Sequence, residues 1–179
     1  MKNLILLLLV NCSFTIAVNS QTKEQRIDVI RKMYTEAQRL IQDNKEVKCS
    51  KGNKPNYESF NPESEKVKFD QPMKKCILPK NYTVYEASFN GYHWYENIFI
   101  YLKSEKVFFV FFKSGGEGCE TEDRIYFDEM GNIIRYLEKT ANCEENNISK
   151  EITDKQSLTR IKNEIDSKIK EIETSIFKK

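Results

Sequence analysis

The chain has 179 residues and a formal net charge of +2, from 29 Lys and Arg against 27 Asp and Glu. This length suits one domain with a real core and excludes two full enzyme domains. An aromatic content of 12% argues against a disordered chain. The near-neutral charge offers no electrostatic footprint for nucleic acid, so we expect no nucleic-acid partner.

Residues 1–20 predict a secretory signal peptide. A short basic start precedes the apolar run 4–10, and small residues at 18–20 suit cleavage before Gln21. The apolar run is shorter than a membrane helix needs, and no other segment is long enough. We therefore expect an exported protein, periplasmic or secreted, with no membrane span after cleavage. Lipidation at Cys12 is a less favoured alternative, because a bulky polar residue precedes this cysteine.

Four of the five cysteines lie in the mature chain, residues 21–179. In an oxidising compartment an even number of cysteines favours disulfides, although sequence alone leaves the pairing open. Cys119 and Cys143 flank the two strands of a predicted hairpin, and antiparallel pairing would bring them opposite each other. This favours Cys119–Cys143 and, by elimination, Cys49–Cys76. The wide spacing of the cysteines does not suit a zinc site, so we expect no metal.

Apolar spacing predicts a helix at each end of the mature chain. Within 22–45 apolar residues recur every three to four positions, and Thr22 with Gln25 has the spacing of a capping box. Residues 154–177 carry a similar apolar stripe and predict a long C-terminal helix. Segment 45–80 holds all four prolines and shows no sustained period, so we expect an irregular segment, with a short strand at 66–69 as an option, held by the Cys49–Cys76 disulfide.

Residues 81–139 predict the sheet. Asn90-Gly91 is a strong short-range hairpin signal, and short connections between successive apolar runs predict an antiparallel meander. The predicted fold class is α+β, with an N-terminal helix, a five-stranded antiparallel meander and a long C-terminal helix in a single domain over residues 21–179. The five predicted strands are 82–89, 92–103, 107–113, 121–128 and 132–139.

Two central runs, 98–102 and 107–112, are apolar at successive positions. A strand that buries only one face should alternate with polar residues. Two interpretations follow. Either the helices or the long irregular segment cover both faces of the sheet, or one face presents an aromatic surface to a partner, which includes a second copy in a homodimer.

The predicted first hairpin is the candidate ligand-binding surface. Tyr92, His93, Trp94 and Tyr95 follow its turn, and 12 of the chain's 21 aromatic residues lie within 82–112. Trp and Tyr are frequent at binding hot spots, and their rings stack well against other flat apolar faces. We hypothesise that this hairpin binds a protein or a glycan.

The sequence contains few residue patterns that are typical of a catalytic site. His93 is the only histidine, so a Ser-His-Asp or Cys-His arrangement would have to include it. No serine has the G-x-S-x-G context of a nucleophile elbow, and the mature cysteines are expected to be oxidised. The sequence therefore favours a non-catalytic binding module without a cofactor over a hydrolase that uses His93.

An acidic run at 117–123 surrounds Cys119. Its carboxylates and flanking glycines are compatible with calcium chemistry, but their spacing matches no EF-hand loop. We expect a solvated acidic loop.

The stretch 126–135, Tyr-Phe-Asp-Glu-Met-Gly-Asn-Ile-Ile-Arg, resembles the tyrosine/aspartate–glycine hairpin repeats of many bacterial exported proteins. With Gln21 after the predicted cleavage, the whole layout resembles small uncharacterised exported proteins of Bacteroidetes-type bacteria. The order of helix then meander is similar to cystatin-like and PepSY-like folds, which implies an inhibitor or a binding module. This resemblance supplies the alternative of a periplasmic inhibitor or immunity-type protein, although no cystatin-type inhibitory motif is visible.

Overall fold

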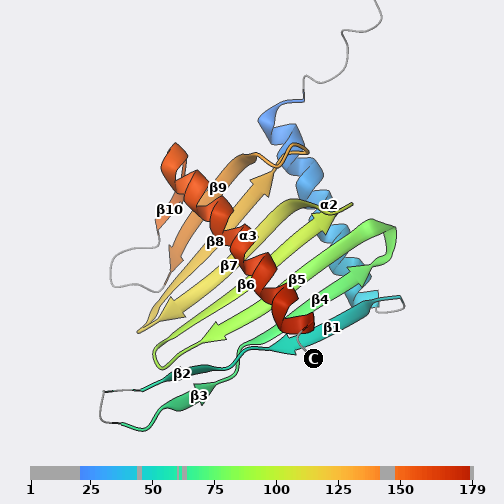
Figure 1. Ribbon diagram of the computed structural model, residues 1–179. Helices are drawn as coiled ribbons and strands as arrows, with labels where there is room; N and C mark the ends of the chain where they lie inside the picture. Colours follow the sequence, from blue (N-terminus) through green and yellow to red (C-terminus); the bar gives the residue numbers. More distant parts are fainter. Residues whose placement is uncertain (1–20, 44–45, 60, 62–63, 142–147, 178–179) are drawn as a thin grey trace, which may run out of the picture.

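The computed structural model in Figure 1 describes residues 21–43, 46–59, 61, 64–141 and 148–177. The predicted signal peptide over 1–20 lies outside the described residues. The described chain is α+β, with a helix before and a helix after a large antiparallel sheet. No helix of the described part is both long enough and apolar enough to cross a membrane.

The main sheet has eight antiparallel strands in the order β1-β4-β5-β6-β7-β8-β9-β10. The predicted meander is confirmed as its centre, from β5 to β9, while the predicted count of five strands is wrong. A separate two-stranded ribbon, β2–β3, extends from one end of the sheet (Figure 1). The strands are β1 Lys48–Asn53, β2 Asn56–Glu58, β3 Val67–Phe69, β4 Pro72–Leu78, β5 Tyr82–Asn90, β6 Trp94–Lys103, β7 Lys106–Gly116, β8 Cys119–Phe127, β9 Ile133–Ala141 and β10 Ile148–Glu151.

Four of these strands lie in the segment 45–80 that was expected to be irregular. The two outermost strands of the main sheet, β1 and β10, are almost entirely exposed. Hydrophobic alternation arises from burying one face of a strand, and an exposed edge strand has no such requirement. These strands therefore carry no apolar pattern that the sequence could reveal.

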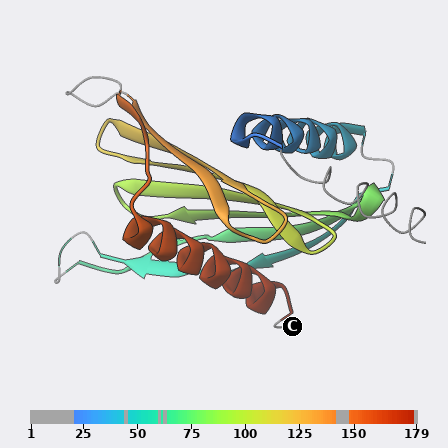
Figure 2. The ribbon, with the colours of Figure 1, turned by 90° about the horizontal axis from the view of Figure 1, so that it is seen from above.

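The two helices lie on opposite faces of the sheet, α2 (Lys23–Asp43) on one and α3 (Lys155–Phe177) on the other (Figure 2). The predicted capping box of α2 is present. The Thr22 amide donates to the Gln25 side-chain oxygen at 2.9 Å, and the Gln25 amide donates to Thr22 Oγ1 at 3.2 Å. Helix α3 is capped by Asp154, whose carboxylate accepts from the Ser157 amide at 2.8 Å.

A hydrophobic cluster fills each side of the sheet, which accounts for strands that are apolar at successive positions. In β6, Ile98 and Ile100 pack in the cluster under α3, whereas Tyr101 and Phe99 pack in the cluster under α2. Successive side chains of a strand point to opposite faces, so each face needs its own apolar set. The helices thus cover both faces, as the first of the two interpretations requires.

The predicted disulfide between Cys49 and Cys76 is confirmed. The two residues are direct partners in the register of β1 and β4, so the bond joins the edge strand to the interior of the sheet. Cys119 is also disulfide-bonded. Cys143, the partner predicted for it, lies outside the described residues.

Candidate functional site

The four predicted contact residues lie in and after the turn between β5 and β6. The Gly91 amide donates to the Trp94 carbonyl at 3.0 Å and closes this turn. Tyr92 and His93 occupy the turn, while Trp94 and Tyr95 begin β6. His93 is exposed, and 44% of Trp94 is accessible to solvent. The turn therefore presents its largest apolar side chain outward.

The β2–β3 ribbon packs against this turn. The ring of Tyr92 meets the ring of Phe69 edge-on, with centroids 5.2 Å apart, and the Tyr92 amide donates to a carboxylate oxygen of Glu58 at 3.2 Å. The buried side chain of Gln71 donates to the Asn90 carbonyl at 2.8 Å and accepts from the Asn90 amide at 3.3 Å. These contacts join two segments that are distant in sequence.

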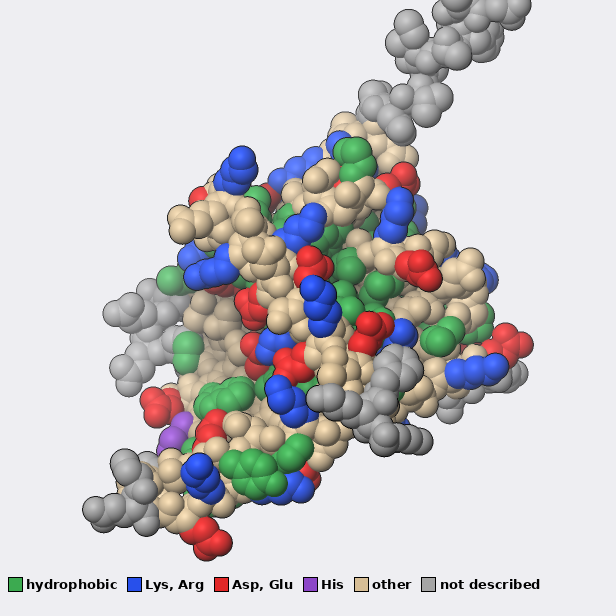
Figure 3. Space-filling model, viewed as in Figure 1, with side chains coloured by type: hydrophobic (Ala, Val, Ile, Leu, Met, Phe, Trp, Pro, Cys, Tyr) green, Lys and Arg blue, Asp and Glu red, His purple; other side chains and the backbone are tan. Residues whose placement is uncertain are grey.

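We call the joined area the ribbon-end surface and define it by Val67, Phe69, Tyr92, His93 and Trp94. Val67 and Trp94 are among the exposed large apolar residues, and Phe69 and Tyr92, which contact each other, are half-buried. Apolar and charged side chains lie together at this end of the molecule, where β2 and β3 extend (Figure 3). The sequence indicates the turn and a short strand at 66–69, but neither the partner strand β2 nor the contact between ribbon and turn.

Tyr95 lies apart from the ribbon-end surface, within the sheet. Its hydroxyl donates to the carboxylate of Glu120, which also pairs with Lys113 at 3.2 Å. Gly115 lies between Tyr95 and Glu120 in the register, and a Cβ there would come within 2.8 Å of the tyrosine ring. The hydrogen bond to Glu120 raises the pKa of Tyr95, and bonds from Tyr95 and Lys113 lower the pKa of Glu120. The Tyr95 hydroxyl is thus engaged inside the fold.

Replacing Tyr95 by Phe should lower the free energy of unfolding by about 1 kcal/mol, because a charge-assisted hydrogen bond is lost while the ring stays in place. Guanidinium chloride unfolding measures this change. The matched control is Tyr57→Phe in β2, where 55% of the residue is exposed. That variant should differ from the wild type by less than about 0.5 kcal/mol. Equal effects of the two substitutions would contradict the structural role of Tyr95.

Asp123 differs from the solvated loop residue that the sequence indicated. It lies in β8 and pairs in register with Phe112 and Glu138. One of its carboxylate oxygens accepts from the Tyr136 hydroxyl at 3.3 Å, and the other is buried without a hydrogen-bond partner among the described residues. Burial, followed by the charge of Glu138, raises the pKa of Asp123 to about 6. The expectation of a solvated acidic loop is wrong at this position, because strand alternation turns the side chain inward.

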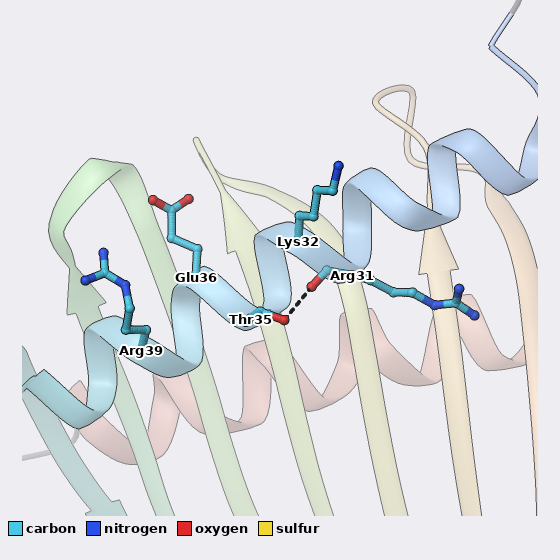
Figure 4. Close-up of a pocket in the computed structure, with 5 residues that line it drawn as sticks. All are labelled: Arg31, Lys32, Thr35, Glu36 and Arg39. Atoms are coloured by element: carbon cyan, nitrogen blue, oxygen red, sulfur yellow. Dashed lines mark hydrogen bonds between the residues drawn. The ribbon is translucent and has the colours of Figure 1, made fainter.

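A shallow hollow of about 500 Å³ lies along the outer side of α2, and its lining does not form a convergent site. Figure 4 shows that Lys32, Glu36 and Arg39 rise from the same side of the helix, while Arg31 extends sideways, away from them. Glu36 is already occupied, since its carboxylate accepts from Lys80 at 2.6 Å and from the Tyr82 hydroxyl at 2.8 Å. These bonds lower the pKa of Glu36. With Glu36 engaged by Lys80 and Tyr82, and Arg31 extending away, the lining does not converge on one ligand group.

A second hollow of about 320 Å³ lies between α2 and strands β7 and β8, and we call it the α2 groove. Helix α2 forms its wall, and cross-strand pairs of β7 and β8 form its floor. Aromatic side chains dominate the lining, together with two arginines. The lining residues are Ile30, Arg31, Tyr34, Phe109, Phe111, Arg124 and Tyr126.

Within the described part of the chain, no three His, Cys, Asp or Glu side chains come together to hold a metal ion. The two hollows lie along α2, and neither is lined by His93.

No family model matches this chain, and no curated protein and no solved structure shows a significant match to it.

Proposed function

We propose that the protein is an exported, non-catalytic binding module that engages a protein or glycan partner through the ribbon-end surface. The observation that carries the proposal is the position of Trp94. It is the chain's only tryptophan, and 44% of it is exposed on a turn whose backbone is fixed by hydrogen bonds. A large apolar side chain held outward in this way has the character of a binding hot spot.

The surface is supported from beneath. Phe69 and Tyr92 are packed edge-on, and Gln71 bonds the end of β5 in both directions. A partner that binds here orders few new side chains, so little of the contact free energy is spent on lost conformational entropy. Because the aromatic patch is already ordered, we expect a partner to bind it with little rearrangement of the side chains, and not by induced fit.

Export is supported by the disulfide between Cys49 and Cys76. Disulfides of this structural kind persist in oxidising compartments and are rare in the cytosol. The predicted signal peptide over residues 1–20 leads to the same compartment.

Trp94 also provides the test. In the free protein its fluorescence should be quenched readily by acrylamide, and partner binding should protect it. A Trp94→Ala variant should bind the partner at least tenfold more weakly, since hot-spot truncation costs about 2 kcal/mol or more. The partner is sought by screening the mature protein against a glycan array and against the extracytoplasmic proteins of its own cells.

Met130→Ala is the matched control, because Met130 is 80% exposed on a different turn and is equally apolar. This variant should bind as the wild type does. The proposal fails if Trp94→Ala binds normally, or if Met130→Ala weakens binding to the same extent. Light scattering of the wild type decides whether the partner is a second copy: a homodimer formed by this surface should dissociate in the Trp94→Ala variant.

A further inference from the structure

We propose that the α2 groove binds a small amphipathic carboxylate, a molecule with an apolar body and one anionic end. The groove is separate from the ribbon-end surface. Helix α2 crosses the sheet near Tyr82 and Tyr101, whereas the turn of Trp94 lies at the other end of β6. A ligand in the groove and a partner at the ribbon end would therefore occupy different places.

The floor of the groove is aromatic. Phe109 of β7 stands opposite Tyr126 of β8, with ring centroids 5.1 Å apart, and the next pair on the same face is Phe111 with Arg124. Tyr34 of α2 meets the Phe109 ring edge-on at 5.1 Å and is itself 36% exposed. These inclined rings form an apolar floor that is open on one side, which suits an aliphatic chain or a single ring.

The charge of the groove comes entirely from its two arginines. Arg31 leaves α2 sideways, over the strands (Figure 4), and Arg124 rises from β8 with its guanidinium 6.0 Å from the Phe111 ring centroid. The lining contains no acidic residue. Two cations at the border of an apolar bed select an anionic head group, and the planar guanidinium matches a carboxylate with two parallel hydrogen bonds.

Both arginines already have acidic neighbours, and Arg31 also hydrogen-bonds Tyr126 of the groove floor, which holds its guanidinium over the groove. Arg31 pairs with Asp28 at 3.0 Å, and Arg124 pairs with Glu122 at 3.2 Å. The arginine side chains are 54% and 52% exposed in these pairs. Exposed ion pairs of this kind contribute little to stability, so exchanging one for a ligand carboxylate costs little. Each guanidinium also has five N–H donors, of which a single carboxylate contact occupies only some.

The volume limits the size of the ligand. About 320 Å³ lies at the small end of the range for ligand pockets. The groove therefore admits a medium-chain fatty carboxylate or an aromatic carboxylate. Decanoate is a suitable probe, with decanol and decylammonium as neutral and cationic molecules of the same chain length.

The test is calorimetric titration of the wild-type protein with the three probes. We expect decanoate to bind at least tenfold more tightly than decanol, and decylammonium to bind more weakly still. An Arg31→Met/Arg124→Met double variant keeps apolar stems but removes both charges. Its affinity for decanoate should fall to its affinity for decanol. The control is Arg39→Met, since Arg39 lies on the same helix and lines only the outer hollow.

Circular dichroism establishes that the variants fold, as expected for substitutions at exposed arginines. Amide chemical shifts should move near Tyr34 and Phe111 on addition of decanoate and stay unchanged at Trp94. The inference is overturned if decanoate shows no saturable binding, if decanol binds as tightly as decanoate, or if Arg39→Met weakens binding as much as the double variant. Shifts centred on Trp94 would also overturn it, because they would place the ligand on the ribbon-end surface.

Discussion

Replacing Asp123 by Asn should stabilise the protein by about 2 kcal/mol at pH 8 and change its stability little at pH 4. The reason is the position of the carboxylate. One oxygen is buried without a hydrogen-bond partner among the described residues, and burial raises the pKa of Asp123 to about 6. The charges of Glu138, Glu164 and Glu96 act in the same direction. An amide removes the buried charge and keeps an oxygen for the Tyr136 hydroxyl.

The sign follows from comparing the folded and unfolded chains. The pKa of an Asp in the unfolded chain is near its ordinary value of 3.8, whereas the pKa of Asp123 in the folded chain is about 6. Below the lower value Asp123 is protonated in both states and costs nothing. Between the two values the unfolded chain loses its proton first, so stability falls as the pH rises. Above about pH 6 the penalty is constant, at most about 3 kcal/mol for this shift and about 2 after allowing for partial exposure of the group.

Guanidinium chloride unfolding at pH 4 and pH 8 measures the effect. Asp166→Asn is the control, because Asp166 is exposed on α3 and loses one charge in the same way. That variant should change stability by less than about 0.5 kcal/mol at either pH. Equal stabilisation at both pH values, or none at pH 8, would show that the Asp123 carboxylate is adequately solvated.

Asp123 also shows how much of a buried site can be predicted from the sequence. It lies two residues before Ile125, which is fully buried, and so shares a face with it in an extended strand. That signal was present in the sequence, yet the surrounding acidic residues and Cys119 made a solvated loop the simpler interpretation. The predicted strand 121–128 already contains Asp123 and Ile125, so the alternation alone places this carboxylate on the buried face of β8.

The two helices and the strands β5 to β9 could be predicted because their buried side chains leave a pattern in the sequence, periodic in the helices and continuous in β6 and β7. The edge strands β1 and β10 could not, since their exposed side chains carry no such period. The candidate surfaces divide in the same way. The turn of Trp94 was visible from its local signal, Asn90-Gly91, whereas the contact of Phe69 with Tyr92 depends on long-range packing.

The α2 groove had no signal in the sequence. Arg31 and Arg124 are 93 positions apart in the printed numbering, and each resembles an ordinary solvated charge in its own segment. They line one hollow because α2 crosses β7 and β8 on the face that carries Phe111 and Tyr126. A crossing position of this kind is set by the packing of the whole helix, which no local pattern specifies.

Replacing both Cys49 and Cys76 by Ala should lower the free energy of unfolding by about 3.5 kcal/mol, the chain-entropy value for a loop of this length. The bond closes a separation of 27 residues. It also joins β1, an edge strand whose side chains are almost all exposed, to β4, the strand beside it in the described part of the sheet. Small domains have about 5–15 kcal/mol of total stability, so the loss is a large fraction of it.

Denaturant unfolding of the double variant measures the loss, and hydrogen exchange along β1 locates it. Substitution is preferable to chemical reduction, because Cys119 is also disulfide-bonded and would be reduced as well. Alanine suits both positions, since Cys76 is buried and a serine hydroxyl there would need a partner. An unfolding midpoint equal to that of the wild type would show that β1 is held by its backbone hydrogen bonds and by α3 alone.

The same variant links stability to the proposed function. Both strands of the ribbon, β2 and β3, lie inside the loop that Cys49 and Cys76 close. Opening the loop allows β1 and the ribbon more freedom in the folded protein, so Phe69 should hold Tyr92 less firmly. We therefore expect weaker partner binding at the ribbon-end surface, together with easier acrylamide quenching of Trp94. Decanoate binding in the α2 groove should be unchanged, because no lining residue of the groove lies within this loop.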